Sequence, residues 1–303
     1  VEPFNGAATG TGGEIRDRMA GGRASVPLAG TAVYMTSYPR TAADRPWEQY
    51  SAARPWLYQT PRQILTKASN GASDFGNKFG QPLICGSVLT FEHEGKADEP
   101  TYGFDKVIML AGGVGYARRS DAQKGTPEPG EEVVLLGGDN YRIGMGGGAV
   151  SSVNTGQYAG AIELNAVQRS NPEMQKRVEN VIRTLSESED NPIISIHDHG
   201  AGGHLNCLSE LVETTGGHFD LSAFPIGDET LSSKEIIGNE SQERMGLLVK
   251  GDAVERIARI AERERAPMYV VGRTTDDMHL TFEEAGGDKP IDLALSDMFG
   301  SAP

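Results

Sequence analysis

The segment SIHDHGAGGH, at residues 195–204, gathers side chains that could bind a metal ion or a phosphate. A short β-branched run ends in His197 and Asp198, and glycines then lead into a second apolar run. A carboxylate at the end of a strand, facing a glycine-rich turn and a helix N-terminus, is well placed to hold a metal ion on a phosphate group. Two metal interpretations are open: magnesium at Asp198, or zinc at the three histidines of the segment, whose spacing matches no established zinc signature. The third interpretation is that His197, His199 and His204 pack in the core or face solvent.

The segment SSKEIIGNESQER, at residues 232–244, offers oxygen ligands. Ser232 or Ser233 can cap a helix, and Glu235 and Asn239 would then stand four positions apart on one helical face. One carboxylate and one amide oxygen side by side suit magnesium better than zinc. Taken alone, such a pair is equally typical of a solvent-exposed helix face.

The segment GAATGTGGEIRD, at residues 6–17, could bind polyphosphate through its main chain. Its glycines and small residues leave backbone N–H groups uncovered, so we expect a loop that wraps phosphate without steric cost. Arg16 could contact the phosphate and Asp17 could hold a bridging magnesium ion. The segment matches neither the G-x-x-x-x-G-K-[ST] loop nor the G-x-G-x-x-G fingerprint, which disfavours both of those nucleotide-binding folds. The alternative is a flexible glycine loop with an exposed ion pair.

A later glycine run at residues 137–152 follows a predicted strand and precedes a possible helix. With Arg142 it could form an anion pocket, although close helix-to-sheet packing explains its glycines equally well.

The composition excludes several classes of protein. The 303 residues carry 28 basic and 42 acidic side chains, a formal net charge of −14, which excludes a general nucleic-acid binder. No apolar run approaches the roughly 20 residues of a membrane span, so no membrane partner is expected. Cys85 and Cys207 are too few for a disulfide framework, and we expect buried free thiols and a cytoplasmic location. Because the sequence starts at Val1 rather than at methionine, we expect a fragment of a longer protein.

Strand and helix patterns alternate along the second half of the chain, which predicts an α/β (α+β) class. Asn171 followed by Pro172 and an acidic residue predicts a helix start. Strands are expected at residues 31–36, 83–91, 107–111, 133–136, 193–196, 245–249, 268–271 and 279–282, and helices at 61–73, 171–185 and 205–212 and after a cap at Asp252. At twice the usual domain length, the chain is expected to form two domains, 1–118 and 131–303, joined by a charged, Gly- and Pro-rich linker at 119–130.

Seven segments, in order and spacing, resemble phosphoribosylformylglycinamidine synthase, and its long multidomain form most closely. They are GAATGTGGEIRD, SDFGNKFGQP, KVIMLAGGVG, EEVVLLGGDNYRIGMGGGAVSS, VQRSNPEMQKR, SIHDHGAGG and NESQER. Any one of them would be weak, but their agreement over nearly the whole chain is specific. The resemblance implies an ATP-dependent amidotransferase of purine biosynthesis, in the superfamily of aminoimidazole ribonucleotide synthetase.

The resemblance also implies a fold and a reaction. The family builds its synthase from paired halves, each an N-terminal and then a C-terminal α/β domain, and this chain resembles a truncated N-terminal domain with its complete C-terminal domain. ATP phosphorylates the amide oxygen of formylglycinamide ribonucleotide to an iminophosphate, and ammonia from a glutaminase domain displaces the phosphate.

Several site residues are implied by the same resemblance. Nucleotide contacts are implied at Gly6, Ala7, Ala8, Thr9, Gly10, Thr11, Gly12, Gly13, Glu14, Ile15, Arg16, Asp17, Thr90, Phe91 and His197. Magnesium ligands are implied at Asp198, Glu235 and Asn239, where the long form holds an auxiliary, structural nucleotide rather than the ATP that is consumed. No catalytic residue is expected, because the family's catalytic histidine motif precedes the segment that begins this chain.

The implied cofactors are ATP or ADP and magnesium. The implied partners are formylglycinamide ribonucleotide, ATP, the remaining synthase half and the glutaminase domain, and a homodimer of the fragment is also expected. We expect the fragment alone to be inactive. The alternatives are a non-catalytic half that binds a structural magnesium-nucleotide, or another enzyme of the superfamily, such as aminoimidazole ribonucleotide synthetase or selenophosphate synthetase.

Overall fold

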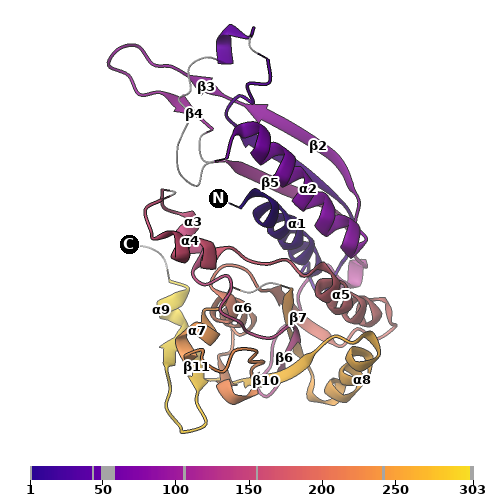
Figure 1. The fold of residues 1–303 in the computed structure, drawn as a ribbon. Coiled ribbons are helices and arrows are strands. Elements are labelled where there is room, and N and C mark those ends of the chain that lie inside the picture. The colour runs from indigo at the N-terminus through magenta and orange to yellow at the C-terminus, as the bar shows by residue number, and fades with distance from the viewer. Residues whose placement is uncertain are drawn as a thin grey trace.

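The computed structural model describes residues 2–42, 44–48, 59–104, 107–154, 156–240 and 243–300. They form a three-stranded sheet in the first half of the chain, a seven-stranded sheet in the second half and a two-stranded hairpin. Figure 1 shows helices α1 (Pro3–Met19) and α2 (Pro61–Phe79) side by side against the small sheet. This mixture of helices and sheets confirms the predicted α/β (α+β) class.

The small sheet has the strand order β2-β1-β5. Strand β1 (Val26–Thr36) pairs parallel with β2 (Leu83–Thr90) and antiparallel with β5 (Ile108–Tyr116). The hairpin of β3 (Glu92–His93) and β4 (Tyr102–Gly103) and the 3-10 turns η1 (Pro46–Glu48) and η2 (Arg119–Asp121) complete this half.

One face of the small sheet is left uncovered. Ala32 and Tyr34 of β1 are buried on the side of the helices. Residues at the alternate positions of β1, β2 and β5 lie on the opposite face, as the strand register shows, and several of them are exposed and apolar. This open face is made by Cys85, Leu89, Ile108, Leu110 and Val114. The prediction that both thiols are buried is therefore wrong for Cys85 and right for Cys207.

Helix α1 overturns the prediction of a glycine loop at residues 6–17. A Cβ on Gly12 would lie 2.7 Å from the ring of Phe75, and a Cβ on Gly71 would lie 2.0 Å from the carbonyl oxygen of Phe4. The small residues thus let α1 and α2 approach closely. This packing outweighs the roughly 1 kcal/mol that each helical glycine costs, and the main-chain N–H groups are used within the helix instead of wrapping phosphate.

The large sheet has the order β12-β11-β8-β10-β6-β9-β7. Its strands are β6 (Glu132–Gly137), β7 (Ile193–Asp198), β8 (Gly217–Asp220), β9 (Arg244–Val249), β10 (Met268–Thr274), β11 (His279–Glu283) and β12 (Ile291–Ala294). Helices α5 (Pro172–Glu187) and α8 (Val254–Glu264) pack on one face, and α6 (Gly203–Leu211), α7 (Ser233–Ile237) and α9 (Leu295–Met298) on the other. Shorter elements are α3 (Gly147–Ser151), α4 (Gly160–Ala166), η3 (Leu221–Ala223) and η4 (Gly251–Ala253).

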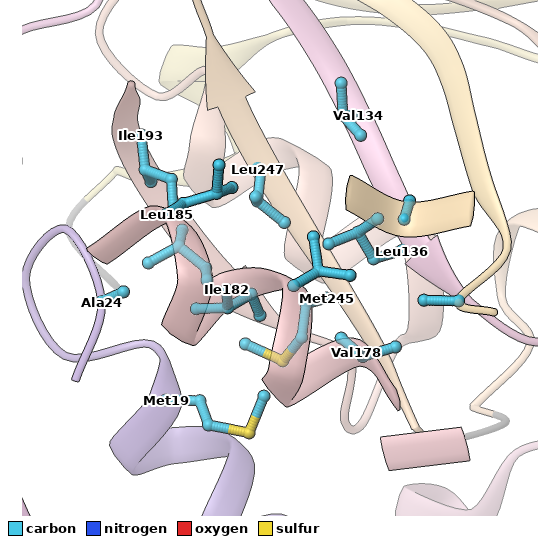
Figure 2. Packing of buried hydrophobic residues seen from close by; sticks show 14 of the residues in the cluster. Met19, Ala24, Val134, Leu136, Val178, Ile182, Leu185, Ile193, Met245 and Leu247 are labelled. Atoms are coloured by element: carbon cyan, nitrogen blue, oxygen red, sulfur yellow. The ribbon is translucent and has the colours of Figure 1, made fainter. Parts of the chain in front are cut away.

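Alternation along β6 divides the second half into two apolar layers. Val134 and Leu136 face the α5 side, whereas Val133 and Leu135 face the α6 side. The α5 layer also takes in Met19 and Ala24 from the first half, which Figure 2 shows beside α5 and β9. Helix α1 and the loop after it therefore share a core cluster with the large sheet, whereas Ala32 and Tyr34 of the small sheet belong to a separate cluster.

The predicted elements are largely present, with shifted ends. The helix after Asn171 is capped as expected, since its side chain accepts from Met174 N, and the helix from residue 61 runs on to Phe79. Asp252 does not cap α8, because it lies inside η4 and Ala253 takes the cap position. The sequence did not predict β8 or β12. Among the described residues no helix is long and apolar enough to cross a membrane.

Candidate functional site

A pocket of about 300 Å³ lies where the loop after β6 faces the start of α5. Strands β6 and β9 pair antiparallel, so the end of β6 and the residue before β9 fall at the same edge of the sheet. This brings together three segments that are distant in sequence: GGDNYR, VQRSNPEM and NESQER. The lining residues are Gly138, Asp139, Tyr141, Ile143, Gln168, Arg169, Asn171, Met174, Glu243 and Pro267.

Glu243 is the most buried acidic group of this pocket. The residue is 5% exposed, its φ is 63°, and one carboxylate oxygen, Oε1, accepts no hydrogen bond from the residues that the structure describes. Burial raises the pKa of Glu243, while Arg16 and a backbone hydrogen bond from Asn171 oppose that rise. The carboxylate is thus held in place with one oxygen left to accept a hydrogen bond.

Arg16 brings the end of α1 to the large sheet. Its Nη1 donates to Oε1 of Gln175 at 2.8 Å, and Nε2 of Gln175 donates to the carbonyl of Gly12 at 3.1 Å. Its Nε lies 3.8 Å from Oδ2 of Asp198. Burial lowers the pKa of Arg16, and Glu243 and then Asp198 counter that shift. Arg16 is therefore a buried cation between the pocket and the end of β7.

The end of β7 carries two of the predicted site residues. Burial raises the pKa of Asp198, and Arg16 opposes the rise. Nδ1 of His197 lies 2.8 Å from a carboxylate oxygen of Glu210, and its Nε2 contacts the Lys124 ammonium. Burial, and secondly Lys124, lower the pKa of His197 to about 4, so the imidazole is neutral at pH 7.

Glu235 and Asn239, predicted with Asp198 as magnesium ligands, contact other groups. Glu235 accepts hydrogen bonds from Ser232 N at 2.8 Å and Ser232 Oγ at 2.9 Å, which lower its pKa. Helix α7 ends at Ile237, so the prediction of one helical face for Glu235 and Asn239 is wrong. The reason is that Glu235 serves in the capping box at the start of a helix of only five residues.

Asn239 is fully buried, and its Oδ1 accepts from Nη2 of Arg244 at 3.1 Å. Each of the three predicted ligands thus contacts a different residue: Asp198 contacts Arg16, Glu235 contacts Ser232 and Asn239 contacts Arg244. Within the described ranges, no group of three or more His, Cys, Asp or Glu side chains is placed to hold a metal ion.

His199 and His204 belong to a buried polar cluster. His199 Nε2 lies 2.9 Å from His204 Nδ1, and His204 Nε2 lies 3.2 Å from Oδ1 of Asn140 and 2.8 Å from Nη1 of Arg244. Burial, and secondly the Arg244 cation, lower the pKa of both histidines far below their usual value. These two residues are packed core histidines.

The remaining predicted contacts lie on α1 and at the end of β2. Residues 6–17 form most of α1, where Asp17 is exposed and near enough to Asp198 to raise its pKa. Thr90 ends β2, and the exposed ring of Phe91 lies 5.9 Å from that of Phe104.

The pocket residues Asp139, Gln168, Asn171 and Glu243 were not predicted as site residues, although Asn171 was predicted to start a helix. The signal that could have found them was their place in three of the seven resembling segments, each next to one end of a predicted strand or the start of a predicted helix.

Comparisons with known proteins cover most of the chain. Residues 128–284 match the family described as AIR synthase related protein, C-terminal domain. The chain is 44% identical over 274 residues to the probable phosphoribosylformylglycinamidine synthase, chloroplastic/mitochondrial, of Arabidopsis thaliana, which covers 90% of this chain and 19% of that protein. It is 40% identical over 302 residues to the phosphoribosylformylglycinamidine synthase of Drosophila melanogaster, covering 98% of this chain and 22% of that protein.

A solved structure of T. maritima PurL complexed with FGAR has a TM-score of 0.75 to this chain at 25% identity. The match covers 100% of this chain and 44% of the PurL chain. The chain thus spans about a fifth of the length of the two curated relatives.

Proposed function

Because this chain belongs to the AIR synthase related protein family, we propose that it is part of a phosphoribosylformylglycinamidine synthase, an ATP-dependent C–N ligase of purine biosynthesis. The two curated relatives carry that name, at 44% and 40% identity. T. maritima PurL has been solved with FGAR and, in another structure, with ATP. The chain spans 19% and 22% of the curated relatives, so we assign it a part of the activity.

The proposed reaction has two steps. The amide oxygen of formylglycinamide ribonucleotide attacks the γ-phosphorus of ATP, which releases ADP and leaves an iminophosphate. Ammonia from a glutaminase domain then adds to the carbon of that amide, and phosphate leaves to give the amidine. Placement of the reactants supplies most of the rate enhancement in such a reaction, which suits an acidic, glycine-rich protein without basic patches.

The observation that carries this proposal is the meeting of three resembling segments at one pocket, beside the buried Arg16. Residues of one reaction centre must converge in space, and GGDNYR, VQRSNPEM and NESQER do so from separate elements. In this proposal the pocket belongs to the substrate site, and α1 contributes to nucleotide binding with Thr90, Phe91 and His197. Because α1 is helical, exposed side chains such as Asp17 would make that contact.

We include magnesium at Asp198, Glu235 and Asn239 in the proposal only because of the type of atom that these side chains offer. All three offer the hard oxygen atoms that magnesium prefers. Their described contacts with Arg16, Ser232 and Arg244 do not direct the oxygens to one point, so the present arrangement does not fit a shared ion. We derive no step of the reaction through the metal.

The proposed nucleotide site, which includes His197 and its neighbour Asp198, is tested by thermal unfolding with and without magnesium-ADP. Nucleotide is expected to raise the midpoint of the wild type and not that of Asp198→Asn. An equal response of both proteins would remove Asp198 from the site.

We further propose that residues 1–118 and 131–303 are two domains and that the open face of the small sheet docks against the remaining synthase half. Leu110 and Val114 are 53% and 56% exposed there, and contiguous apolar surface of this kind is typical of an interface. Without that half, two fragments are expected to pair through the same face. We place the protein in the cytoplasm, where its two free thiols would stay reduced.

The proposed function is tested by titrating the 303-residue chain with formylglycinamide ribonucleotide in a calorimeter. We expect saturable binding, weakened by Asp139→Asn and unaffected by the control Asp228→Asn, which lies outside the pocket. Absence of binding by a chain that circular dichroism shows to be folded would refute the proposal. Tighter binding of the amidine product would instead favour aminoimidazole ribonucleotide synthetase.

Activity of the same chain is measured with ATP, ammonia and formylglycinamide ribonucleotide. No amidine is expected, because the chain spans only 19% and 22% of the curated relatives, whose remaining parts are expected to complete the site. Amidine formation at a measurable rate would show that the site is complete without them.

A further inference from the structure

We propose that Lys124 is a positioning residue of the proposed nucleotide site, and that its ammonium fixes the tautomer and the orientation of the His197 imidazole. This inference rests on the proposed function, since His197 is a nucleotide contact there. It gives a role to a residue of the segment 119–130, which the sequence analysis treats only as a linker between two domains.

The segment that carries Lys124 is anchored along the edge of the large sheet. Strand β7 is the last strand in the order of that sheet, so one of its edges is free of other described strands. At this edge Gly125 N donates to the carbonyl of Ile194 at 2.7 Å. Just before the segment, Arg118 donates to two main-chain carbonyls at the end of α5, at 2.5 Å each. Lys124 therefore reaches β7 from a backbone that is held on both sides.

The two ring nitrogens of His197 have partners of opposite kinds. Nε2 contacts the Lys124 ammonium, and Nδ1 lies 2.8 Å from a carboxylate oxygen of Glu210. An ammonium can only donate a hydrogen bond, and an ionised carboxylate can only accept one. The hydrogen bond at each nitrogen selects the tautomer of a neutral imidazole, so Nε2 is the bare nitrogen and Nδ1 carries the proton.

These two partners also fix the plane of the ring. The main chain of His197 is already set, because β7 pairs with β9 and Cys207 Sγ donates to the His197 carbonyl at 3.6 Å. The torsion that turns an imidazole ring is otherwise broad and roughly two-fold, and a partner at each nitrogen removes that freedom. The side chain is 19% exposed, so part of the ring is open to a ligand. With both nitrogens engaged, it meets a nucleotide through its face and not through a hydrogen bond.

The first measurement is the nitrogen NMR spectrum of protein with isotope-labelled histidine, at pH 8, where histidine is neutral. The ring signals of His197 are those missing from His197→Asn. In Glu210→Met, Lys124 is the remaining partner that selects the tautomer, and we expect the proton to stay on Nδ1. Adding Lys124→Met to that variant is expected to give a mixture of both tautomers. Adding Lys67→Met instead, at an exposed lysine of α2, leaves the proton on Nδ1.

The second measurement is calorimetric titration with magnesium-ADP. We expect Lys124→Met to weaken binding about threefold to tenfold, the range of one lost hydrogen bond. Lys124→Arg, which keeps a donor, and the control Lys67→Met are expected to bind within about twofold of the wild type. Lys124 is an exposed residue, so all three variants are expected to fold, and equal melting temperatures without nucleotide would check this.

Mixed tautomers in Glu210→Met would overturn the inference, because Lys124 would then not select the protonated nitrogen. Unchanged nucleotide binding by Lys124→Met would overturn it as well. The outcome separates from that of the proposed function. Should formylglycinamide ribonucleotide fail to bind while both measurements turn out as expected, only the proposed function falls; should it bind while either measurement fails, only the present inference falls.

Discussion

Buried polar residues set the properties of this protein at the scale of single side chains. Asn140, His204 and Arg244 have almost no exposed surface and satisfy one another. Glu14 lies under the small sheet, where Gln81 Nε2 donates to it at 2.7 Å and Arg18 forms an ion pair with it. Each such group stabilises the fold only while its partners remain and its protonation state is kept.

Glu14 predicts a pH dependence of stability. Burial raises its pKa from 4.5 to about 7, with Arg18 opposing. The folded chain therefore binds more protons than the unfolded chain between these values, and this contribution to stability is full below pH 4.5 and is lost as the pH rises through 7. We expect the melting temperature of Glu14→Gln minus that of the wild type to rise from pH 4.5 to 7 and then level off.

The difference between the two proteins cancels the contributions of the buried histidines, whose lowered pKa values act in the opposite direction. A difference that stays constant from pH 4 to 8 would mean that Glu14 titrates normally.

Arg244 predicts a large loss of stability on truncation. Arg244→Met leaves Asn140, His204 and Asn239 short of a buried donor, and we expect the free energy of unfolding to fall by about 2–4 kcal/mol. Chemical denaturation measures this, with the exposed Arg259→Met as control, expected within about 0.5 kcal/mol of the wild type. Equal effects of the two variants would show that the buried cluster contributes no net stability.

At the scale of elements, the contact between α1 and α2 depends on glycine. Gly71 faces the main chain of Phe4 with no room for a methyl group, whereas a Cβ on Gly6 would meet nothing within 4 Å. Both residues are helical, so helix propensity predicts the same effect of an alanine substitution at each. Any difference between the two substitutions must therefore come from packing.

These two glycines make a matched pair of variants. Gly71→Ala is expected to lower the free energy of unfolding by about 1–3 kcal/mol, because α1 must move away from α2. Gly6→Ala is expected to raise it by about 0.5–1 kcal/mol through better helix propensity. The measurement is urea denaturation of both, and stabilisation by Gly71→Ala would disprove the close helix contact.

The same contact explains how far the sequence could predict this fold. Local signals sufficed where the chain carries its own helix cap or a short apolar run, as at Asn171 and along β6. Local signals failed for residues 6–17. A glycine run there could form a loop or a packed helix, and the choice depends on contact with α2, which lies about 60 residues later in the chain. The pocket was missed for the same reason: Asp139, Asn171 and Glu243 are ordinary polar residues until the sheet brings them together.

At the scale of the whole molecule, the open face of the small sheet predicts self-association. Leu89, Ile108, Leu110 and Val114 expose apolar surface on one side. We expect the wild-type chain to form dimers in light scattering after gel filtration, and Leu110→Glu to shift it toward monomer. Leu293→Glu, at a comparably exposed site on β12, serves as the control. A wild-type chain that is monomeric at high concentration would argue against this interface.

Met19 and Ala24 lie in the same cluster as α5 and β9, so α1 and the loop that follows it cannot leave the large sheet without exposing a shared apolar cluster. A protease that cleaves within residues 119–130 should therefore produce two peptides that still migrate together. Heating the nicked product should give a single cooperative transition, because separation of the peptides would expose the apolar cluster to which both contribute.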